Sequence, residues 1–352
     1  MKILKTFWQR RSDGVWHGVA IKGLDLRGEQ GGGSCDDLFP VHDDIVLTQA
    51  SPAPGIPFQS IGTVRSFLGE SVVPIVANVR GESRLRCVGT GFFVSCTGLL
   101  ITAAHVITDP IEREYGDVAE HDDVTWHMRQ LNFGVMVPTN PIFQRRGFVF
   151  YPFEWTMFLA EKRESPIPFQ GIDLKLNSDI AICKVPPRPD GAAHQPLSIV
   201  QPGIRGTSLV VGASVGAVGY SGMSDVDLVK GANGAIAFEG VFDLYGSVGS
   251  IREWLPDNSV SRIFSTPGPC FSFDARITPG MSGGPIFDRE GIYVHGVVSK
   301  GLQGEAGPEK LSFGSMLGPS LGLPIARMNG LSLVDIQTKG NEGMPILRGP
   351  GL

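Results

Sequence analysis

The sequence lacks several features that would mark particular classes of protein. No apolar run approaches the roughly 18 residues of a membrane-spanning helix, and none of signal-peptide length follows the charged N-terminus. Charge of one sign is not in large excess, since 30 basic and 35 acidic residues give a net charge of −5. We therefore expect neither a membrane nor a nucleic acid as a partner, because nucleic-acid binding favours a basic field.

Cysteine is scarce, with five residues in a chain of 352. Their number is odd, no CxxC pair occurs, and no cysteine and histidine residues have the spacing of zinc ligands. We expect no disulfide framework and no metal site. A reducing, cytoplasmic location fits this usage, although a single Cys87–Cys96 bridge stays open as an alternative.

Glycine and proline, in contrast, are abundant, with 47 and 26 residues. Both favour turns and short strands over long helices. From about residue 71 the chain shows short β-branched runs separated by glycine, and helical periodicity is nearly absent. The pattern predicts an all-β barrel or sandwich, with strands at 72–77, 91–94, 99–102, 180–185, 208–211, 217–219 and 292–298.

Four segments differ from this pattern of strands. Residues 1–70 contain Gly/Pro-rich stretches, and we interpret them as a partly ordered N-terminal extension with no assigned role. Residues 111–171 interrupt the series and open with an acidic stretch, which predicts a solvated insertion. Residues 186–191 are typical of a linker between two β units, and residues 327–352 are interpreted as a glycine-rich C-terminal tail.

Three segments supply residue types that fit together as a nucleophilic site. His105 ends the run LITAAH, Asp179 directly precedes the run IAI, and Ser282 lies in the glycine-rich turn PGMSGGP. A serine hydroxyl needs an adjacent base, histidine can accept and return its proton, and a buried aspartate fixes the imidazole tautomer. The backbone N–H groups of Gly280 and Ser282 would stabilise the oxyanion. This chemistry requires no metal and no organic cofactor.

The three motifs resemble those of the trypsin/chymotrypsin-like serine proteases. TAAHV is similar to the family's histidine motif, SDIAI to its aspartate motif and PGMSGGP to its serine motif, while GTGFFV and GVVSKG resemble two of its strands. The serine segment is most similar to that of the high-temperature-requirement branch, whose PDZ domains are not expected here. The resemblance spans about residues 71–326.

The resemblance implies a fold of two packed six-stranded antiparallel β-barrels, preceded by the N-terminal extension. The first barrel would span about residues 71–185, including the insertion, and the second about residues 192–326. His105 and Asp179 would lie on the first barrel and Ser282 on the second, facing a cleft between them.

The implied function is that of a serine endopeptidase, which cleaves protein or peptide substrates through an acyl-enzyme on Ser282. A catalytically silent binding or regulatory protein on the same scaffold is the alternative. Activation by a protein partner through residues 1–70 or 111–171 is compatible with the endopeptidase. Met281 stands where digestive relatives have an aspartate that pairs with a newly cleaved N-terminus, so activation by such cleavage is not expected.

Substrate preference depends on the residues around the family's specificity pocket. By position, Arg276 would form the base of this pocket, which would favour an acidic side chain before the scissile bond. If Arg276 points away or is neutralised by Asp274, a small apolar preference is expected instead. The expected substrate-binding residues are Arg276 and Ile277 at the base, Ser299, Lys300 and Gly301 in one wall, and Gly314 in the opposite wall.

Overall fold

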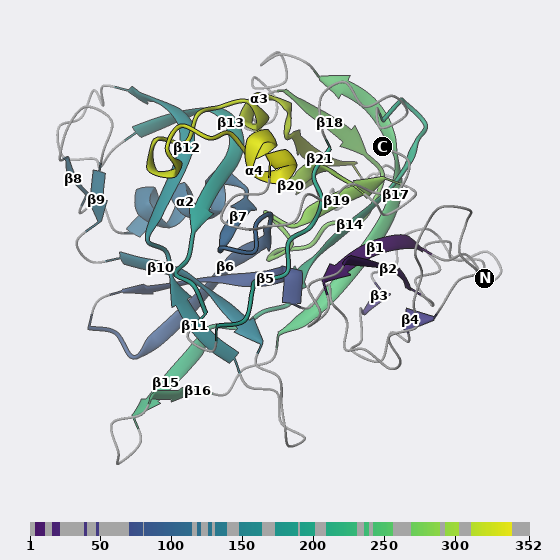
Figure 1. The fold of residues 1–352 in the computed structure, drawn as a ribbon. Helices are drawn as coiled ribbons and strands as arrows, with labels where there is room; N and C mark the ends of the chain where they lie inside the picture. The colour runs from purple at the N-terminus through teal and green to yellow at the C-terminus, as the bar shows by residue number, and fades with distance from the viewer. Residues whose placement is uncertain are drawn as a thin grey trace.

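The structure, a computed structural model, consists mainly of β-strands arranged in two large sheets (Figure 1). It describes residues 4–10, 16–21, 39–40, 47–48, 70–79, 81–114, 118–120, 126–128, 131–138, 148–163, 173–188, 191–200, 209–230, 236–238, 242–255, 269–288, 293–302 and 311–339. Among these residues, no helix has the length and apolar character needed to cross a membrane.

The first large sheet is antiparallel and follows the order β11-β10-β5-β6-β7-β13-β12, with β15 added at β6. Among the described residues, no pairing joins its outer strands β11 and β12, so this barrel is open. Its strands are β5 (Val72–Val79), β6 (Arg84–Phe93), β7 (Leu99–Thr102), β10 (Leu131–Pro138), β11 (Phe148–Pro152), β12 (Trp155–Arg163) and β13 (Asp173–Lys184), with the hairpin β15 (Val226–Lys230) and β16 (Ile236–Phe238).

The hairpin predicted around residues 96–98 is confirmed. β6 and β7 pair Gly91 with Thr102 and Phe93 with Leu100. All four residues of β7 are buried, and so are the last five of β6. Strands that are buried on both faces read as continuous apolar runs, which is why the sequence shows them without polar alternation. Cys87 and Cys96 are both free thiols, so the bridge between them is not formed.

The predicted insertion at 111–171 is wrong for its central part. β10 pairs with β5 and β12 pairs with β13, so residues 131–163 supply strands of the first sheet. The acidic stretch suggested a solvated segment, but Val135 and Met136 further along are fully buried. The other elements of this region are the helix α2 (Ala104–Glu114) and the small hairpin of β8 (Val118–Glu120) and β9 (Trp126–Met128).

The second large sheet closes into a six-stranded barrel. Its order is β14-β19-β20-β21-β18-β17, and β17 pairs back onto β14 from Ser214↔Ser250 to Ser221↔Asp243. The predicted double-barrel architecture is therefore confirmed, with the second barrel closed and the first one open. The strands are β14 (Ser214–Ser221), β17 (Asp243–Leu255), β18 (Cys270–Phe273), β19 (Pro285–Asp288), β20 (Val294–Leu302) and β21 (Leu311–Met316).

The strand predicted at 208–211 is wrong. Val210 and Val211 are exposed by 63% and 58%, and they lie in a turn that precedes β14. The Ala213 N–H donates to the Val210 carbonyl at 2.9 Å, and Gly212 takes a positive φ of 86°. Glycine adopts this dihedral without strain, so it ends the apolar run in a tight turn.

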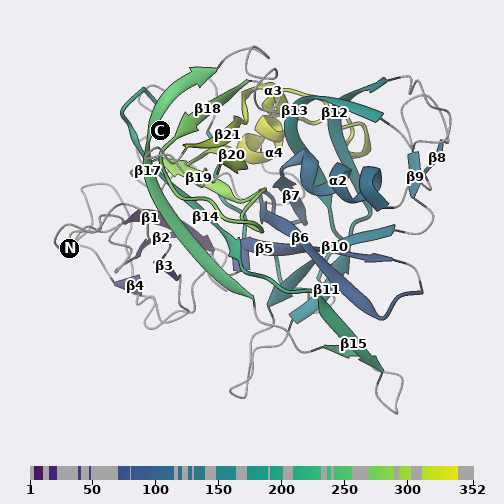
Figure 2. The same ribbon diagram turned by 180° about the vertical axis from the view of Figure 1, so that it is seen from behind.

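Part of the predicted N-terminal extension continues the second sheet. β3 (Phe39–Pro40) pairs with β17, while β1 (Leu4–Arg10), β2 (Trp16–Ile21) and β4 (Leu47–Thr48) form a separate three-stranded sheet. Both ribbon views place these strands on the β17 side of the molecule (Figures 1 and 2). The other residues between 1 and 69 lie outside the described residues.

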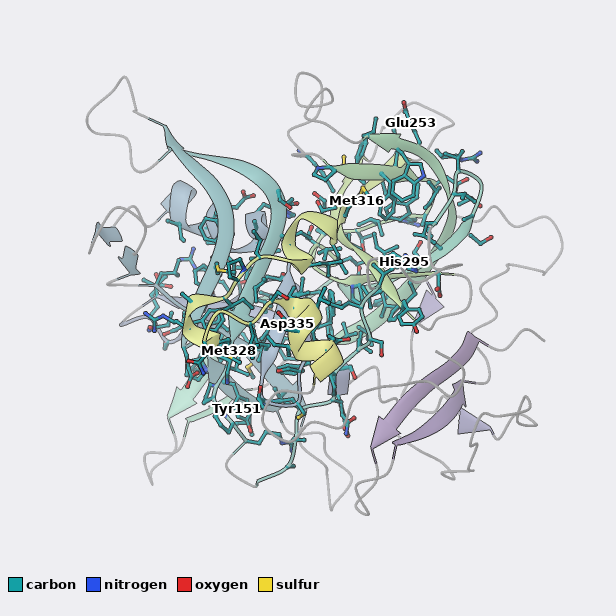
Figure 3. All side chains as sticks on the ribbon, turned by 45° about the horizontal axis from the view of Figure 1, so that its top comes forward. Tyr151, Glu253, His295, Met316, Met328 and Asp335 are labelled. Atoms are coloured by element: carbon teal, nitrogen blue, oxygen red, sulfur yellow. The ribbon has the colours of Figure 1, made fainter. Side chains whose placement is uncertain are left out.

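The segment predicted as a glycine-rich tail contains a capped helix, so that interpretation is wrong for residues 327–339. The elements here are α3 (Gly318–Leu321), the 3-10 helix η2 (Ala326–Met328) and α4 (Leu333–Lys339). Ser332 caps α4, because its Oγ accepts the Asp335 N–H at 3.2 Å while Asp335 Oδ2 accepts the Ser332 N–H at 3.2 Å (Figure 3 labels Asp335). Residues 340–352 lie outside the described residues.

The buried amide of Gln337 holds α4 against the first barrel. Its Nε2 donates to the carbonyls of Val94 at 2.6 Å and Leu197 at 3.1 Å, and its Oε1 accepts the Ile199 N–H at 3.2 Å. One side chain thereby satisfies three buried backbone groups, each of which would be costly to leave unpaired. Residues 197–199, which follow the predicted linker, are thereby joined through this helix to Val94 of the first barrel.

Candidate active site

His105 lies in the first turn of α2, directly after β7. The first N–H groups of a helix have no partner within the helix, and a carboxylate is well placed to accept them. Asp179 Oδ1 accepts the His105 backbone N–H at 2.9 Å, and Asp179 Oδ2 lies 2.8 Å from His105 Nδ1. The same carboxylate therefore caps the helix and orients the imidazole, which leaves Nε2 as the ring atom that can accept a proton.

Asp179 lies on β13 with its side chain 1% exposed. Besides the two His105 groups, it accepts a hydrogen bond from the hydroxyl of Ser299 on β20. Burial alone would raise the pKa of Asp179, but the charge of His105 and the hydrogen bonds from His105 and Ser299 outweigh burial and lower it. Asp179 is thus ionised at neutral pH and links the two barrels.

Ser282 lies in the turn that precedes β19. Its half-exposed hydroxyl donates to the Ser299 carbonyl at 3.2 Å and makes no hydrogen bond to His105 in the described structure. Ser299 therefore connects all three predicted residues, since its hydroxyl binds Asp179 and its carbonyl holds Ser282. Attack on a substrate requires the Ser282 hydroxyl to rotate toward His105 Nε2, a change between staggered rotamers.

The predicted oxyanion residues belong to the same turn. Among the described residues, the N–H groups of Gly280 and Ser282 donate no hydrogen bond, so both are available to an incoming oxygen. Gly280 has a φ of 94°, and a Cβ there would lie 2.8 Å from the Tyr220 carbonyl. The Met281 side chain between them is fully buried in the core of the second barrel. Apolar packing therefore anchors this turn at Met281.

The GTGFFV segment noted in the sequence lies against this turn. The Thr90 N–H donates to the Ser282 carbonyl at 2.8 Å, and a Cβ at Gly89 would lie 2.9 Å from the same carbonyl. The segment thus joins the first barrel to the Ser282 turn of the second. The sequence predicts a strand for these residues but not their contact with Ser282.

The structure does not assemble the predicted base of a specificity pocket. Arg276 is exposed, which does not fit a residue at the base of a pocket, and Asp274 is paired with Arg252 and the Ser250 N–H. Ile277 is buried in the core of the second barrel. Arg276 therefore lies at the surface of the second barrel, and its selection of an acidic substrate side chain stays a prediction.

Gly314, predicted to lie in the wall of the specificity pocket opposite Ser299, Lys300 and Gly301, faces the inside of the second barrel instead. Gly314 pairs with Val298, and its Cβ would lie 2.5 Å from the Ile286 side chain, inside the barrel. Ser312 stands opposite Gly301 instead, because a bulge between Val298 and Lys300 shifts the register. Counting along the sequence could not reveal this shift.

The segment around Ile277 is packed directly against the other expected wall. A Cβ at Gly301 would lie 2.8 Å from the Ile277 carbonyl and 3.1 Å from the Ile277 Cβ. Lys300, the residue before Gly301, is exposed. A substrate side chain can pass between Gly301 and Ile277 only after one of the two segments moves.

The charges around His105 raise its pKa. Burial by itself lowers the pKa, but the charge and hydrogen bond of Asp179, with a further contribution from the charge of Asp109, outweigh burial and the opposing charge of Lys300. The same carboxylates stabilise the imidazolium form of His105. The base is therefore stronger than an ordinary histidine.

The raised pKa of His105 predicts the pH dependence of activity. Only neutral imidazole can accept the serine proton, so kcat/KM should rise with pH and reach half its plateau above about 6.5, the ordinary histidine value. A pH–rate profile on a peptide substrate measures this midpoint. Asp109→Asn should move it down and Lys300→Met should move it up; a wild-type midpoint below 6.5 would contradict the prediction.

The described part of the chain contains no group of three or more His, Cys, Asp or Glu side chains arranged to hold a metal ion. A hydroxyl, an oriented imidazole, a buried carboxylate and two available N–H groups are the parts needed for acyl transfer.

Comparisons with known proteins identify a family for this fold. The family model described as a trypsin-like peptidase domain matches residues 89–296, more than half of the chain, and this range contains His105, Asp179 and Ser282. A search of curated proteins found no match. Similar solved structures include Deg5, with 16% identity, a TM-score of 0.39, and coverage of 72% of this chain and 88% of that chain. The apo MamO protease domain from Magnetospirillum magneticum has 16% identity, a TM-score of 0.38, and coverage of 72% and 95%.

Proposed function

The chain belongs to the family of trypsin-like peptidase domains, and on that premise we propose that it is a serine endopeptidase acting on protein or peptide substrates. Ser282 is the nucleophile, His105 the general base and Asp179 the residue that orients the base. The observation that carries the proposal is the bonding of Asp179 to both the backbone and the ring of His105, with Ser299 connecting that pair to Ser282.

The proposed reaction uses only groups of this chain. As the Ser282 Oγ–carbon bond forms, the hydroxyl proton passes to His105 Nε2, and the oxyanion accepts hydrogen bonds from the N–H groups of Gly280 and Ser282. His105 then gives the proton to the leaving amine as the peptide C–N bond breaks, which leaves the acyl-enzyme. Water, deprotonated by His105, releases the acyl group and restores the serine.

A second candidate function is supported by two observations. The Ser282 hydroxyl is directed at the Ser299 carbonyl, and Ile277 is packed against Gly301. A protein that kept this arrangement would be a catalytically silent binding protein. A protein partner acting through residues 1–70 or the predicted insertion, or the substrate itself, could instead move the segment and open the site, in which case a small apolar side chain would enter most readily.

Covalent labelling with a fluorophosphonate tests the proposal. The probe reacts only with a serine that has a working base and oxyanion donors, so wild-type protein should gain one adduct, mapped by mass spectrometry to Ser282. Ser282→Ala and His105→Ala should gain none. Absence of labelling in the wild-type protein, with and without peptide substrate present, would favour the silent binding protein.

A further inference from the structure

Thr90, in the middle of the GTGF segment on β6, is a residue of the first barrel whose side chain bonds to the second. Its side chain is fully buried where the two barrels meet. The Thr90 Oγ1 donates to the Gly280 carbonyl at 2.7 Å and accepts the Tyr220 N–H at 2.9 Å. The hydroxyl therefore uses its hydrogen as well as a lone pair, and both partners belong to the second barrel.

The backbone of Thr90 makes two further contacts. Its N–H donates to the Ser282 carbonyl at 2.8 Å, and its carbonyl accepts the Thr102 hydroxyl at 2.7 Å. Thr102 is itself the last residue of β7, two residues before α2 and three before His105. Thr90 thus connects the nucleophile turn to the strand that carries the general base.

These contacts fix the peptide planes of the nucleophile turn. In the plane between residues 280 and 281, the carbonyl is held by Thr90 Oγ1 and the N–H donates to the Thr278 carbonyl. In the plane between residues 282 and 283, the carbonyl is held by the Thr90 N–H and the N–H donates to Val298. The plane between them carries the Ser282 N–H, and its carbonyl accepts the Gly284 N–H.

A trans peptide points its N–H and C=O in opposite directions, so holding one group fixes the other. Thr90 holds the planes on both sides of the one that carries the Ser282 N–H. Loss of its hydroxyl would release the Gly280 carbonyl and leave the first of these planes held only by the Met281 N–H bond to Thr278, within the turn itself. The plane would then be anchored less firmly, next to a glycine, the residue with the least torsional resistance. The two oxyanion donors would then no longer be held in one direction.

We propose that Thr90 is a positioning residue for the oxyanion donors, acting from the first barrel through the Gly280 carbonyl. This role rests on the proposed endopeptidase function. Met281 cannot form the ion pair made by the aspartate that digestive relatives have at this position. The neutral hydroxyl of Thr90 orders the turn instead.

Three variants test this role, with kcat, KM, the rate of fluorophosphonate labelling and thermal unfolding measured for each. Thr90→Val keeps the shape and removes the hydroxyl; it should lower kcat and the labelling rate about 100-fold, the size of effect seen when an oxyanion donor is lost, with KM changed less than about threefold. Thr90→Ser restores the hydroxyl and should recover kcat to within about fivefold of wild type. Thr156→Val, which removes a hydroxyl bonded to Cys183, is the matched control and should leave kcat unchanged.

Hydrogen exchange gives a readout that does not depend on activity. The amides of residues 278–284 should exchange faster in Thr90→Val than in wild type, and not in Thr156→Val. Wild-type kcat and exchange in a folded Thr90→Val protein would overturn the proposal, as would a Thr90→Ser protein as slow as Thr90→Val. If Thr90→Val does not fold, Thr90→Ser decides through the same measurements. A wild-type protein that is not labelled would contradict the endopeptidase function itself. Failure of that proposal is thereby distinguished from failure of the Thr90 proposal.

Discussion

Replacement of Ser282 by alanine is expected to lower kcat for a cleavable peptide by about 10⁶-fold, because the nucleophile and its proton are both removed. The measurement is peptide hydrolysis by the pure variant, with product quantified over long incubations. Stability should hardly change, since the substitution removes one half-exposed hydrogen bond to Ser299, worth about 1 kcal/mol. Residual activity within 100-fold of wild type would show that another group performs the chemistry.

A double substitution gives this prediction a sharper form. Residues that act as one unit show non-additive losses, so His105→Ala added to Ser282→Ala should cause almost no further decrease. The free energies from the four proteins form a thermodynamic cycle. Additive losses would mean that His105 and Ser282 act separately, contrary to the mechanism.

Gly283→Ala is expected to abolish activity and to lower the free energy of unfolding by more than about 4 kcal/mol, a loss that single substitutions rarely cause. Gly283 has a φ of 88°, and a Cβ there would lie 2.0 Å from the Thr90 carbonyl and 2.1 Å from Thr102 Oγ1. Neither neighbour can yield, because both belong to paired strands inside the first sheet. Chemical denaturation with circular dichroism measures the loss.

Gly212 offers a matched control for the clash. Its φ of 86° is nearly the same, yet a Cβ there would have nothing within 4 Å. Gly212→Ala should therefore cost only the backbone strain, about 1–2 kcal/mol, and leave activity intact. Equal losses for the two variants would show that the dihedral angle, and not the contact with β6, makes Gly283 necessary.

The elements that the sequence predicted well are those fixed by local patterns. The β6–β7 hairpin was visible because glycine punctuates two apolar runs that are buried on both faces. The order His105, Asp179, Ser282 was visible because acyl transfer needs a particular set of groups, and the structure connects these three through Ser299. The turn around Ser282 was visible because its glycines occupy positions that no other residue type could fill.

The failures arose where long-range packing overrides local pattern. Val210 and Val211 have strand-forming side chains, but no neighbouring strand covers them in the described structure. The place of Gly314 depended on a bulge in β20, which no residue type signals. The role of Thr90 depended on a contact across 190 residues, which a single sequence cannot reveal.

The helix α4 carries a sequence signal that predicts its start. Ser332 and Asp335 have the spacing of a capping box before the apolar residues of α4, a signal that marks a helix start. The glycine content of the surrounding residues masked it. A helix of only seven residues is also too short to show clear periodicity, so its stability comes from the burial of Leu333 and Ile336.

The three hydrogen bonds of Gln337 bear on the order in which parts of the chain fold during synthesis. Its amide reaches back 243 residues to Val94 and 140 residues to Leu197. While the ribosome is still making the second barrel, the backbone groups of Val94, Leu197 and Ile199 must bond to water instead. Contacts between such distant segments form slowly, because a long loop of chain has to close first. The docking of α4 on the first barrel should therefore be a late folding step, completed only after residue 337 has emerged.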